Sequence, residues 1–107
     1  MPPEVANLFA NLGAASEAEV FETLLQRPGL RLERIVSCGY PSPPGHWYDQ
    51  TGEEWVLLAR GHAILEFEHS TVTLFAGDHL TIPAHCRHRV AEVSPDAIWL
   101  ALHFNSP

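Results

Sequence analysis

From residue 46 onward, apolar and polar positions alternate in short runs along the chain. The runs are separated by turn-forming residues such as Gly, Pro, Asp and Ser. They cover residues 46–50, 54–59, 62–67, 71–75, 79–82, 88–93 and 97–104. Alternation with period two places successive side chains on opposite faces, as in a half-buried β-strand. We therefore predict a series of short strands without a long helix, which is typical of a β-sandwich or barrel.

The segment 19–36 admits two interpretations. Four apolar residues near its start have helical spacing: Val20, Phe21, Leu24 and Leu25. They are followed by a Pro-Gly turn at 28–29, and residues 30–36 then alternate with period two, which indicates a strand. We favour a β-hairpin over a short helix.

Length and composition indicate one folded domain. The chain has 107 residues and a mass of 11.9 kDa, which leaves room for a single core. Its 46% apolar and 18% charged residues are typical of a compact protein. We assign residues 1–16 to an N-terminal arm and residues 17–107 to the barrel domain. Three apolar residues of the arm are expected to dock on the body or on a second subunit: Leu8, Phe9 and Leu12.

The charge pattern excludes several partners. The net charge is −7, and the six cationic residues are scattered arginines, so we expect no nucleic-acid partner. No apolar run approaches the roughly 20 residues that span a bilayer. The N-terminus also lacks the pattern of a signal peptide. We expect no membrane association and a cytoplasmic location.

Cys38 and Cys86 are too few for a disulfide framework and are expected to be free thiols.

Two spaced groups of residues indicate a site. Six residues separate Glu54 from Gly61, and five separate Gly77 from Pro83, with His88 five positions further on. Each group indicates a strand bounded by a Gly turn, and together they bring a carboxylate and an imidazole into a small barrel. Such a pair is a candidate metal pocket.

With these motifs the chain resembles the small single-domain cupins. The segment 42–50 is similar to a bacterial subgroup often labelled mannose-6-phosphate-isomerase-like. The motifs cover residues 46–92, and the strand rhythm extends the resemblance over most of the chain. It implies a double-stranded β-helix, or jelly-roll barrel, with a metal or ligand site at its mouth.

The chain departs from the family pattern at several positions. The family's first motif places a His-x-His pair three or four residues before the Glu. Here those positions hold Tyr48 and Gln50, or Trp47 and Asp49, depending on the spacing used. His85 replaces the Gly of the second motif. The resemblance therefore implies a pocket more strongly than it implies a metal.

We predict four metal ligands: Glu54, His88, Gln50 and His46. In a strand over 46–50, His46, Tyr48 and Gln50 share one face. Mixed nitrogen and oxygen donors suit a divalent ion such as Zn, Fe, Mn or Ni. The sequence leaves open which residue completes the site: His46, Asp49 or His103.

The predicted ligand pocket has four lining residues: Tyr48, Gln50, His85 and His103. Tyr48 is also a candidate catalytic acid or base. His103 shares a strand face with Trp99 and Ala101, and this face lines either the interior or an outer interface. Three histidines at turn edges are expected in solvent: His62, His69 and His79. Two cations that flank His88 are expected to form salt bridges: Arg87 and Arg89.

Three functions remain open from the sequence. The first is a metal-dependent cupin enzyme, isomerase- or dioxygenase-like, acting on a small molecule. The second is a binding or sensing cupin without metal, and the third is a structural module with a vestigial pocket. We expect a homodimer in each case, because an unpaired edge strand is a liability.

Overall fold

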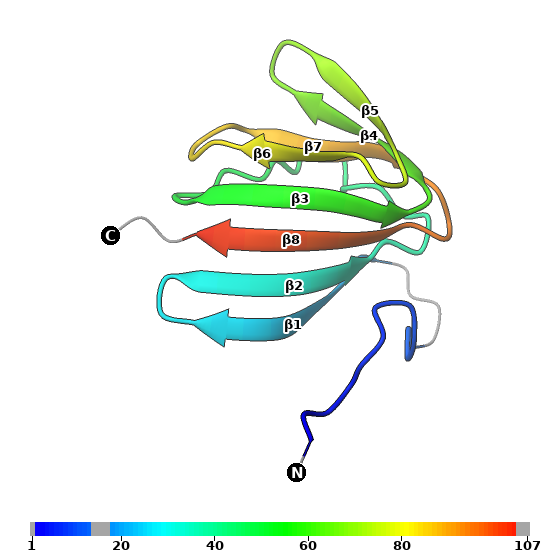
Figure 1. Cartoon of the computed structure of the whole chain (residues 1–107). Helices are drawn as coiled ribbons and strands as arrows, with labels where there is room; N and C mark the ends of the chain where they lie inside the picture. Colours follow the sequence, from blue (N-terminus) through cyan, green and yellow to red (C-terminus); the bar gives the residue numbers. More distant parts are fainter. Residues whose placement is uncertain (1, 14–17, 105–107) are drawn as a thin grey trace.

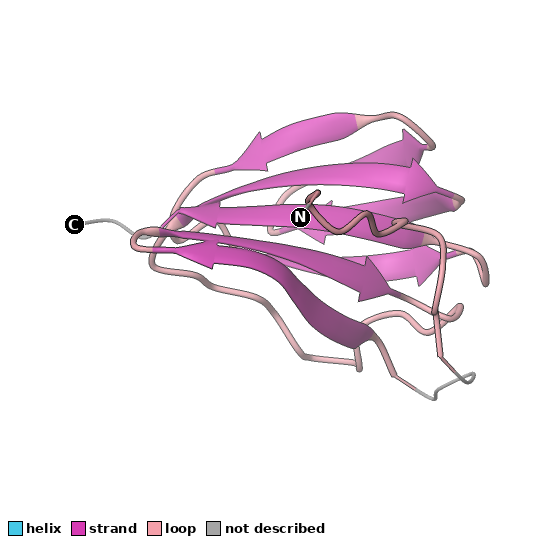
Figure 2. Cartoon of the chain, turned by 60° about the horizontal axis from the view of Figure 1, so that its bottom comes forward, coloured by secondary structure: helices cyan, strands magenta, loops and turns pink. Residues whose placement is uncertain are grey.

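Eight β-strands make up most of the described chain. The structure is a computed structural model that describes residues 2–13 and 18–104. The strands are β1 (Val20–Arg27), β2 (Leu30–Val36), β3 (Glu53–Arg60), β4 (His62–Phe67), β5 (Thr71–Phe75), β6 (His79–Ile82), β7 (His88–Val93) and β8 (Ile98–Phe104). Figure 2 shows only strands and loops within these residues, so the all-β prediction is confirmed. The described residues accordingly contain no helix long and apolar enough to cross a membrane.

The strands form two antiparallel sheets (Figure 1). One has five strands in the order β1-β2-β8-β3-β6, and the other has three in the order β5-β4-β7. The chain changes sheet between β3 and β4, between β5 and β6, and at each later connection. Neighbours in a sheet are therefore often distant in sequence, as in a jelly roll.

Most strands lie where the sequence predicts them. β1 and β2 form the predicted hairpin, so the helical alternative for this segment is wrong. β4, β5, β6 and β7 have the predicted bounds, whereas β3 and β8 differ by one residue at one or both ends.

The predicted strand over 46–50 is wrong. Only Tyr48 pairs there, through an isolated bridge in which its N–H donates to the His88 carbonyl at 2.8 Å and its carbonyl accepts from the His88 N–H at 3.1 Å. The preceding segment contains Pro41, Pro43 and Pro44, which have no N–H to continue a ladder. The segment therefore follows β7 through single contacts, and the expected alternation of His46, Tyr48 and Gln50 does not apply.

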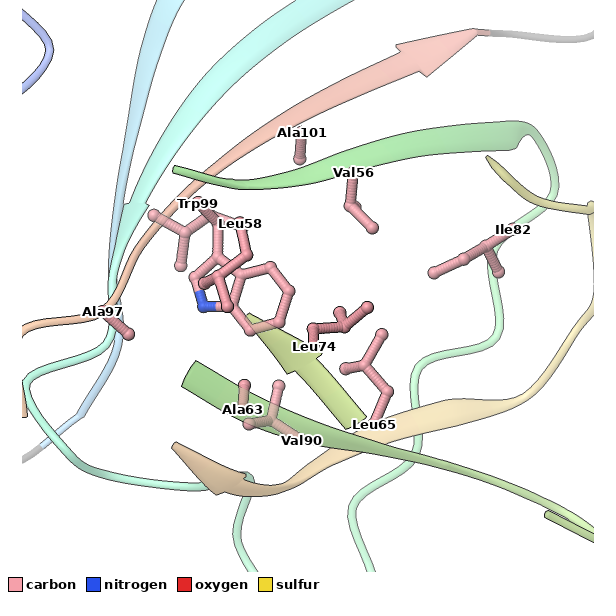
Figure 3. Close-up of a cluster of buried hydrophobic side chains, with 11 residues drawn as sticks. Val56, Leu58, Ala63, Leu65, Leu74, Ile82, Val90, Ala97, Trp99 and Ala101 are labelled. Atoms are coloured by element: carbon pink, nitrogen blue, oxygen red, sulfur yellow. The ribbon is translucent and has the colours of Figure 1, made fainter. Parts of the chain in front are cut away.

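The core lies between the two sheets (Figure 3). Its buried side chains come from the inward positions of β2, β3, β4, β5, β6, β7 and β8 and from the loop before β8. Leu58 of β3 has no exposed surface, and burial of such a side chain contributes about 1.5–3 kcal/mol. Because the same alternation sets every inward position, polar residues at inward positions near the end of the core are buried as well.

Gly61 is the single residue between β3 and β4. Its φ is +89°, in the left-handed region that favours glycine. A Cβ at this position would lie 2.9 Å from the Ala97 Cα and 2.3 Å from the Ser94 Oγ. The close approach of the backbone therefore explains why the motif has a glycine here.

Part of the N-terminal arm docks on the five-stranded sheet. The buried Arg34 guanidinium donates to the carbonyls of Leu8 (2.9 Å), Ala10 (2.7 Å) and Asn11 (3.1 Å), and it also pairs with Glu22. Three backbone carbonyls thus hold the arm against the outer face of β2, and the carboxylate of Glu22 on β1 pairs with the same guanidinium. The predicted boundary between arm and barrel, at residues 16 and 17, lies outside the described residues.

The apolar residues of the arm take different positions. Leu8 and Leu12 are partly buried, whereas Phe9 is exposed and its ring lies 5.4 Å from the Arg60 guanidinium. The arm therefore contacts the body of its own chain mainly through backbone carbonyls, and Phe9 remains accessible.

Candidate functional site

A small pocket opens at one end of the space between the sheets. Its polar lining consists of Glu19, Glu33, Tyr48, Gln50, Glu54 and His88, and its remaining walls are aliphatic and aromatic. The cavity has a volume of about 50 Å³, which is enough for a few waters or a small ligand.

Glu54 and His88 meet in this pocket, as the sequence predicts. Glu54 is the second residue of β3 and His88 the first of β7, so each sheet supplies one of them. The Glu54 Oε1 lies 3.5 Å from the His88 Nε2, and both side chains are buried. The Tyr48 ring stacks on the imidazole at 5.4 Å between centroids. The two motifs are therefore joined across the sandwich.

The His88 ring is held in one orientation. Its Nδ1 lies 2.9 Å from the Cys86 carbonyl. A carbonyl oxygen only accepts, so Nδ1 carries a hydrogen and Nε2 faces the Glu54 carboxylate. Burial alone lowers the pKa of His88, but the Glu54 carboxylate and the Cys86 carbonyl outweigh burial and raise this pKa above its ordinary value of 6.5.

One oxygen of Glu54 has no hydrogen-bond partner. The residue is 5% exposed, and its Oε1 is buried without a donor within hydrogen-bond geometry. The contact to His88 at 3.5 Å is an ion-pair distance and does not satisfy this oxygen. A buried carboxylate oxygen in this state needs a proton donor or a cation.

His103 lies in the interior beside Glu54. The register pairs Glu54 of β3 with His103 of β8, and the His103 Nε2 lies 3.6 Å from the Glu54 Oε2. The same nitrogen donates to the Glu33 Oε1 at 2.7 Å, while the His103 Nδ1 lies 3.2 Å from the Gln50 Oε1. Of the two alternatives for His103, the structure gives the interior. His103 does not line the pocket with Glu54 and His88, however, and instead lines a neighbouring pocket with Arg31 and Gln50.

The sequence did not identify Glu33 as a site residue. Both faces of β2 carry apolar and charged residues, so alternation alone could not decide which face is inward. The only available signal was that Glu33 lies two residues before Ile35, which is part of the core.

Glu19 is a second residue that the sequence did not identify. It accepts from the Tyr48 hydroxyl at 3.2 Å and from the Ser37 hydroxyl at 3.5 Å. Burial raises the pKa of Glu19 in spite of these bonds, which lower it. Glu19 precedes β1 in an irregular segment, where no pattern predicts a direction.

Tyr48 lines the pocket as predicted, and its environment favours the protonated phenol. Burial and the neighbouring Glu19 carboxylate raise the pKa of Tyr48 well above its ordinary value. At neutral pH the phenol is therefore protonated, and its hydroxyl donates to Glu19 rather than acting as a base.

His46 and His85 lie outside the main pocket. His46 is exposed and lines a neighbouring rim pocket with Glu19 and Tyr48, with its ring 5.1 Å from that of Tyr48. The His85 side chain is 66% exposed and pairs with Asp49 at 3.2 Å. The structure therefore does not place either histidine, or Asp49, beside Glu54 and His88.

Other expectations concern residues away from the pocket. Arg87 pairs with Glu68 at 3.4 Å and Arg89 with Glu66 at 2.9 Å, which confirms their predicted salt bridges. The three histidines expected in solvent are exposed: His62, His69 and His79. Both cysteines are free and partly buried.

The fit of a metal ion to these residues is partial. Glu54 Oε1 and His88 Nε2 face one another, and the unpartnered Oε1 suits a cation. The closest further nitrogen, that of His103, is already engaged by Glu33. In residues 2–13 and 18–104, no group of three or more His, Cys, Asp or Glu side chains is arranged to hold a metal.

Solved structures identify the family. No protein-family model and no curated protein matches the chain. A crystal structure from Ralstonia eutropha, described as a candidate mannose-6-phosphate isomerase, is 44% identical over 97% of this chain and 100% of that chain, with a TM-score of 0.90. A cupin superfamily protein from Desulfitobacterium hafniense covers 99% of this chain and 95% of its own, at 18% identity and a TM-score of 0.79. The chain belongs to the cupin superfamily.

A more distant structure agrees with this fold. The cupin domain of a Schizosaccharomyces pombe protein is 12% identical and covers 82% of this chain and 61% of that one, with a TM-score of 0.70. The predicted jelly-roll class and the resemblance to the isomerase-like cupins are thus confirmed for this cupin.

The electrostatic coupling of Glu54 and His88 can be tested by titration. We expect Glu54→Gln to lower the pKa of His88, because burial then acts without the opposing carboxylate. Since the folded pKa is raised, His88 contributes stability that is fully present below pH 6.5 and is lost as the pH rises through the folded pKa. NMR titration of the imidazole and urea unfolding across this range measure both effects.

Glu53→Gln is the matched control for this titration. Glu53 is exposed and adjacent to Glu54 on the opposite face of β3, so its neutralisation should leave the His88 titration in place. An unchanged His88 pKa in Glu54→Gln would show that the carboxylate is not its partner.

Proposed function

We propose that this cupin binds a small molecule in the pocket between its sheets. The observation that carries the proposal is the buried Glu54 Oε1, which lines the pocket and has no hydrogen-bond partner. An unsatisfied buried acceptor costs about 1–3 kcal/mol, and a bound donor removes that cost. The pocket also has the general form of a ligand site, with apolar walls and a few polar groups.

Different lining residues would contact different parts of the ligand. Val56, Leu65 and Trp99 offer apolar contact on two sides of the pocket. Glu54 and His88 would orient a hydrogen-bonding group of the ligand. The Tyr48 ring, stacked on His88, would restrict access from the rim.

A divalent cation at Glu54 and His88 is a second candidate. It is supported by the pair of facing donors and by the fixed His88 ring, whose Nδ1–H is held by a carbonyl as in many metal-binding histidines. Glu54 and His88 would hold the ion, and His103 would join them if its bond to Glu33 opened. When bound, the ion would supply Lewis-acid chemistry suited to an isomerase- or dioxygenase-like reaction.

We also propose a homodimer formed through β1. This strand lies at the edge of the five-stranded sheet, and all eight of its residues are exposed. Phe21 is 48% and Leu24 46% exposed, and the register shifts between Thr23 and Leu25. An exposed apolar edge strand favours pairing with another strand, and a second copy of the chain is the simplest partner.

Native mass spectrometry tests the ligand. We expect a small molecule to co-purify with the wild-type protein and to be lost from Glu54→Gln, with affinity reduced about tenfold or more because the amide removes the charge and replaces one carboxylate oxygen with an NH2 donor. Glu53→Gln should retain it. Absence of any bound molecule, together with failure of small-molecule fragments to bind at the pocket, would contradict the proposal.

Elemental analysis tests the cation. Protein purified without chelator or metal resin should contain about one divalent ion per chain if the second candidate holds. Glu54→Ala and His88→Ala should each lose it, whereas His85→Ala should keep it. Full occupancy in both pocket variants would show that the ion binds elsewhere.

Sedimentation analysis tests the dimer. The wild-type protein should sediment as a dimer, and Leu24→Glu should shift it toward the monomer because a charge cannot be buried there without cost. Val5→Glu is a suitable control, since Val5 is 93% exposed in the arm. A wild-type monomer at all concentrations would exclude this interface.

A further inference from the structure

Carboxylates make up half of the polar residues that line the pocket, beside Tyr48, Gln50 and His88. They are Glu19, Glu33 and Glu54. An ionised carboxylate accepts hydrogen bonds and donates none. The Tyr48 hydroxyl already donates to Glu19, so it offers no free hydrogen in this arrangement. The pocket is therefore matched to a ligand that brings its own hydrogen.

No Lys or Arg side chain lines this pocket, and the described arginines near it are engaged elsewhere. Arg34 lies on the outer face of β2, where it holds the arm. Arg89 donates to Glu66 and to the Ser42 carbonyl. Arg31 approaches Glu33 at 3.8 Å, but it is half-exposed and lines a different pocket. The imidazoles of His88 and His103 each face a carboxylate.

This charge distribution opposes anions. A phosphate monoester carries nearly two negative charges and is usually held by Arg, Lys or a row of backbone N–H groups. Each carboxylate several ångströms from such a group, in a partly buried site, would weaken binding by on the order of tenfold or more. Three acidic side chains on the walls of one pocket, with no Arg or Lys among the lining residues, disfavour that group.

The Glu54 Oε1 indicates which ligand group the pocket favours. It is buried on a residue that lines the pocket, and it has no hydrogen-bond partner, only the ion-pair contact to the His88 Nε2 at 3.5 Å. A hydroxyl or ammonium hydrogen placed against it would satisfy it, whereas a carboxylate or phosphate oxygen would add repulsion. The apolar walls and the small volume of the cavity fit a short apolar body.

We infer that the ligand of this pocket is an alcohol or amine on a short apolar body, and that phosphate esters, hexose 6-phosphates included, do not bind there. The inference rests on the proposed function, because it specifies the ligand of the same pocket. It separates this cupin from the activity in the name of its relative from Ralstonia eutropha, because mannose 6-phosphate is a phosphate ester.

Matched fragments test the charge selectivity. Butan-1-ol, butan-1-amine and butyrate have nearly the same shape and differ in the charge of the head group. Trp99 lines the pocket, and its indole N–H, which donates to the Ser37 hydroxyl at 3.0 Å, is an NMR reporter. Titrations in EDTA, where no metal ion contributes to anion binding, should show the alcohol or the amine binding at least about tenfold more tightly than butyrate. Mannose 6-phosphate should leave the reporter unchanged.

Glu54→Gln provides the variant and Glu53→Gln its control. Glu54→Gln should weaken binding of the amine about tenfold and strengthen that of butyrate, since an amide removes the charge and supplies a donor. Glu53→Gln should change neither. The comparison of fragments in the wild-type protein does not depend on the stability of the variant.

The outcomes separate the inference from the proposed function. Binding of butyrate or mannose 6-phosphate as tightly as the alcohol and the amine would overturn the inference and leave the pocket as a ligand site. A phosphate ester found bound by native mass spectrometry would do the same. If the alcohol and the amine both fail to bind, the inference is overturned; the proposed function then stands only if native mass spectrometry finds a molecule that Glu54→Gln loses.

Discussion

Between β3 and β4 the chain passes from one sheet to the other through the single residue Gly61. The left-handed backbone and the approach to Ala97 and Ser94 leave no room for a side chain at this corner. The corner fixes β3 against β4, and β3 also carries Val56 and Leu58 into the core. The closure of the sandwich, and with it the position of Glu54 on the same strand, depends on this one backbone conformation.

The site follows from that closure. Glu54 comes from the five-stranded sheet and His88 from the three-stranded sheet, so neither has its partner until both sheets have packed. Packing also buries Glu33 and His103 at inward positions near the core. A row of carboxylates and imidazoles is thereby held in a partly dry space, where electrostatic interactions are stronger than in water. One acceptor, the Glu54 Oε1, remains free within this row.

The chain lacks the two histidines of the first cupin motif, and the residues in their place make other contacts. Tyr48 and Gln50 occupy the positions of the two family histidines, and they contact Glu19 and His103 instead of completing a ligand set. The segment that carries them is irregular because its prolines interrupt the ladder. The result is a pocket lined by three carboxylates, and the proposed preference for an alcohol or an amine rests on them.

The sequence by itself determined most of the strands, the hairpin at the N-terminal side and the meeting of Glu54 with His88, but not the irregular course of residues 46–50. Period-two alternation and glycine turns are local signals, so they can be recognised before any packing is known. Only the tertiary structure decided that His103 faces inward, that Glu19 and Glu33 join the pocket, and that His46 and His85 remain outside it. Those placements depend on which strands become neighbours and on how the irregular segment 46–50 lies against β7. Both are set by contacts between residues that are distant in the sequence.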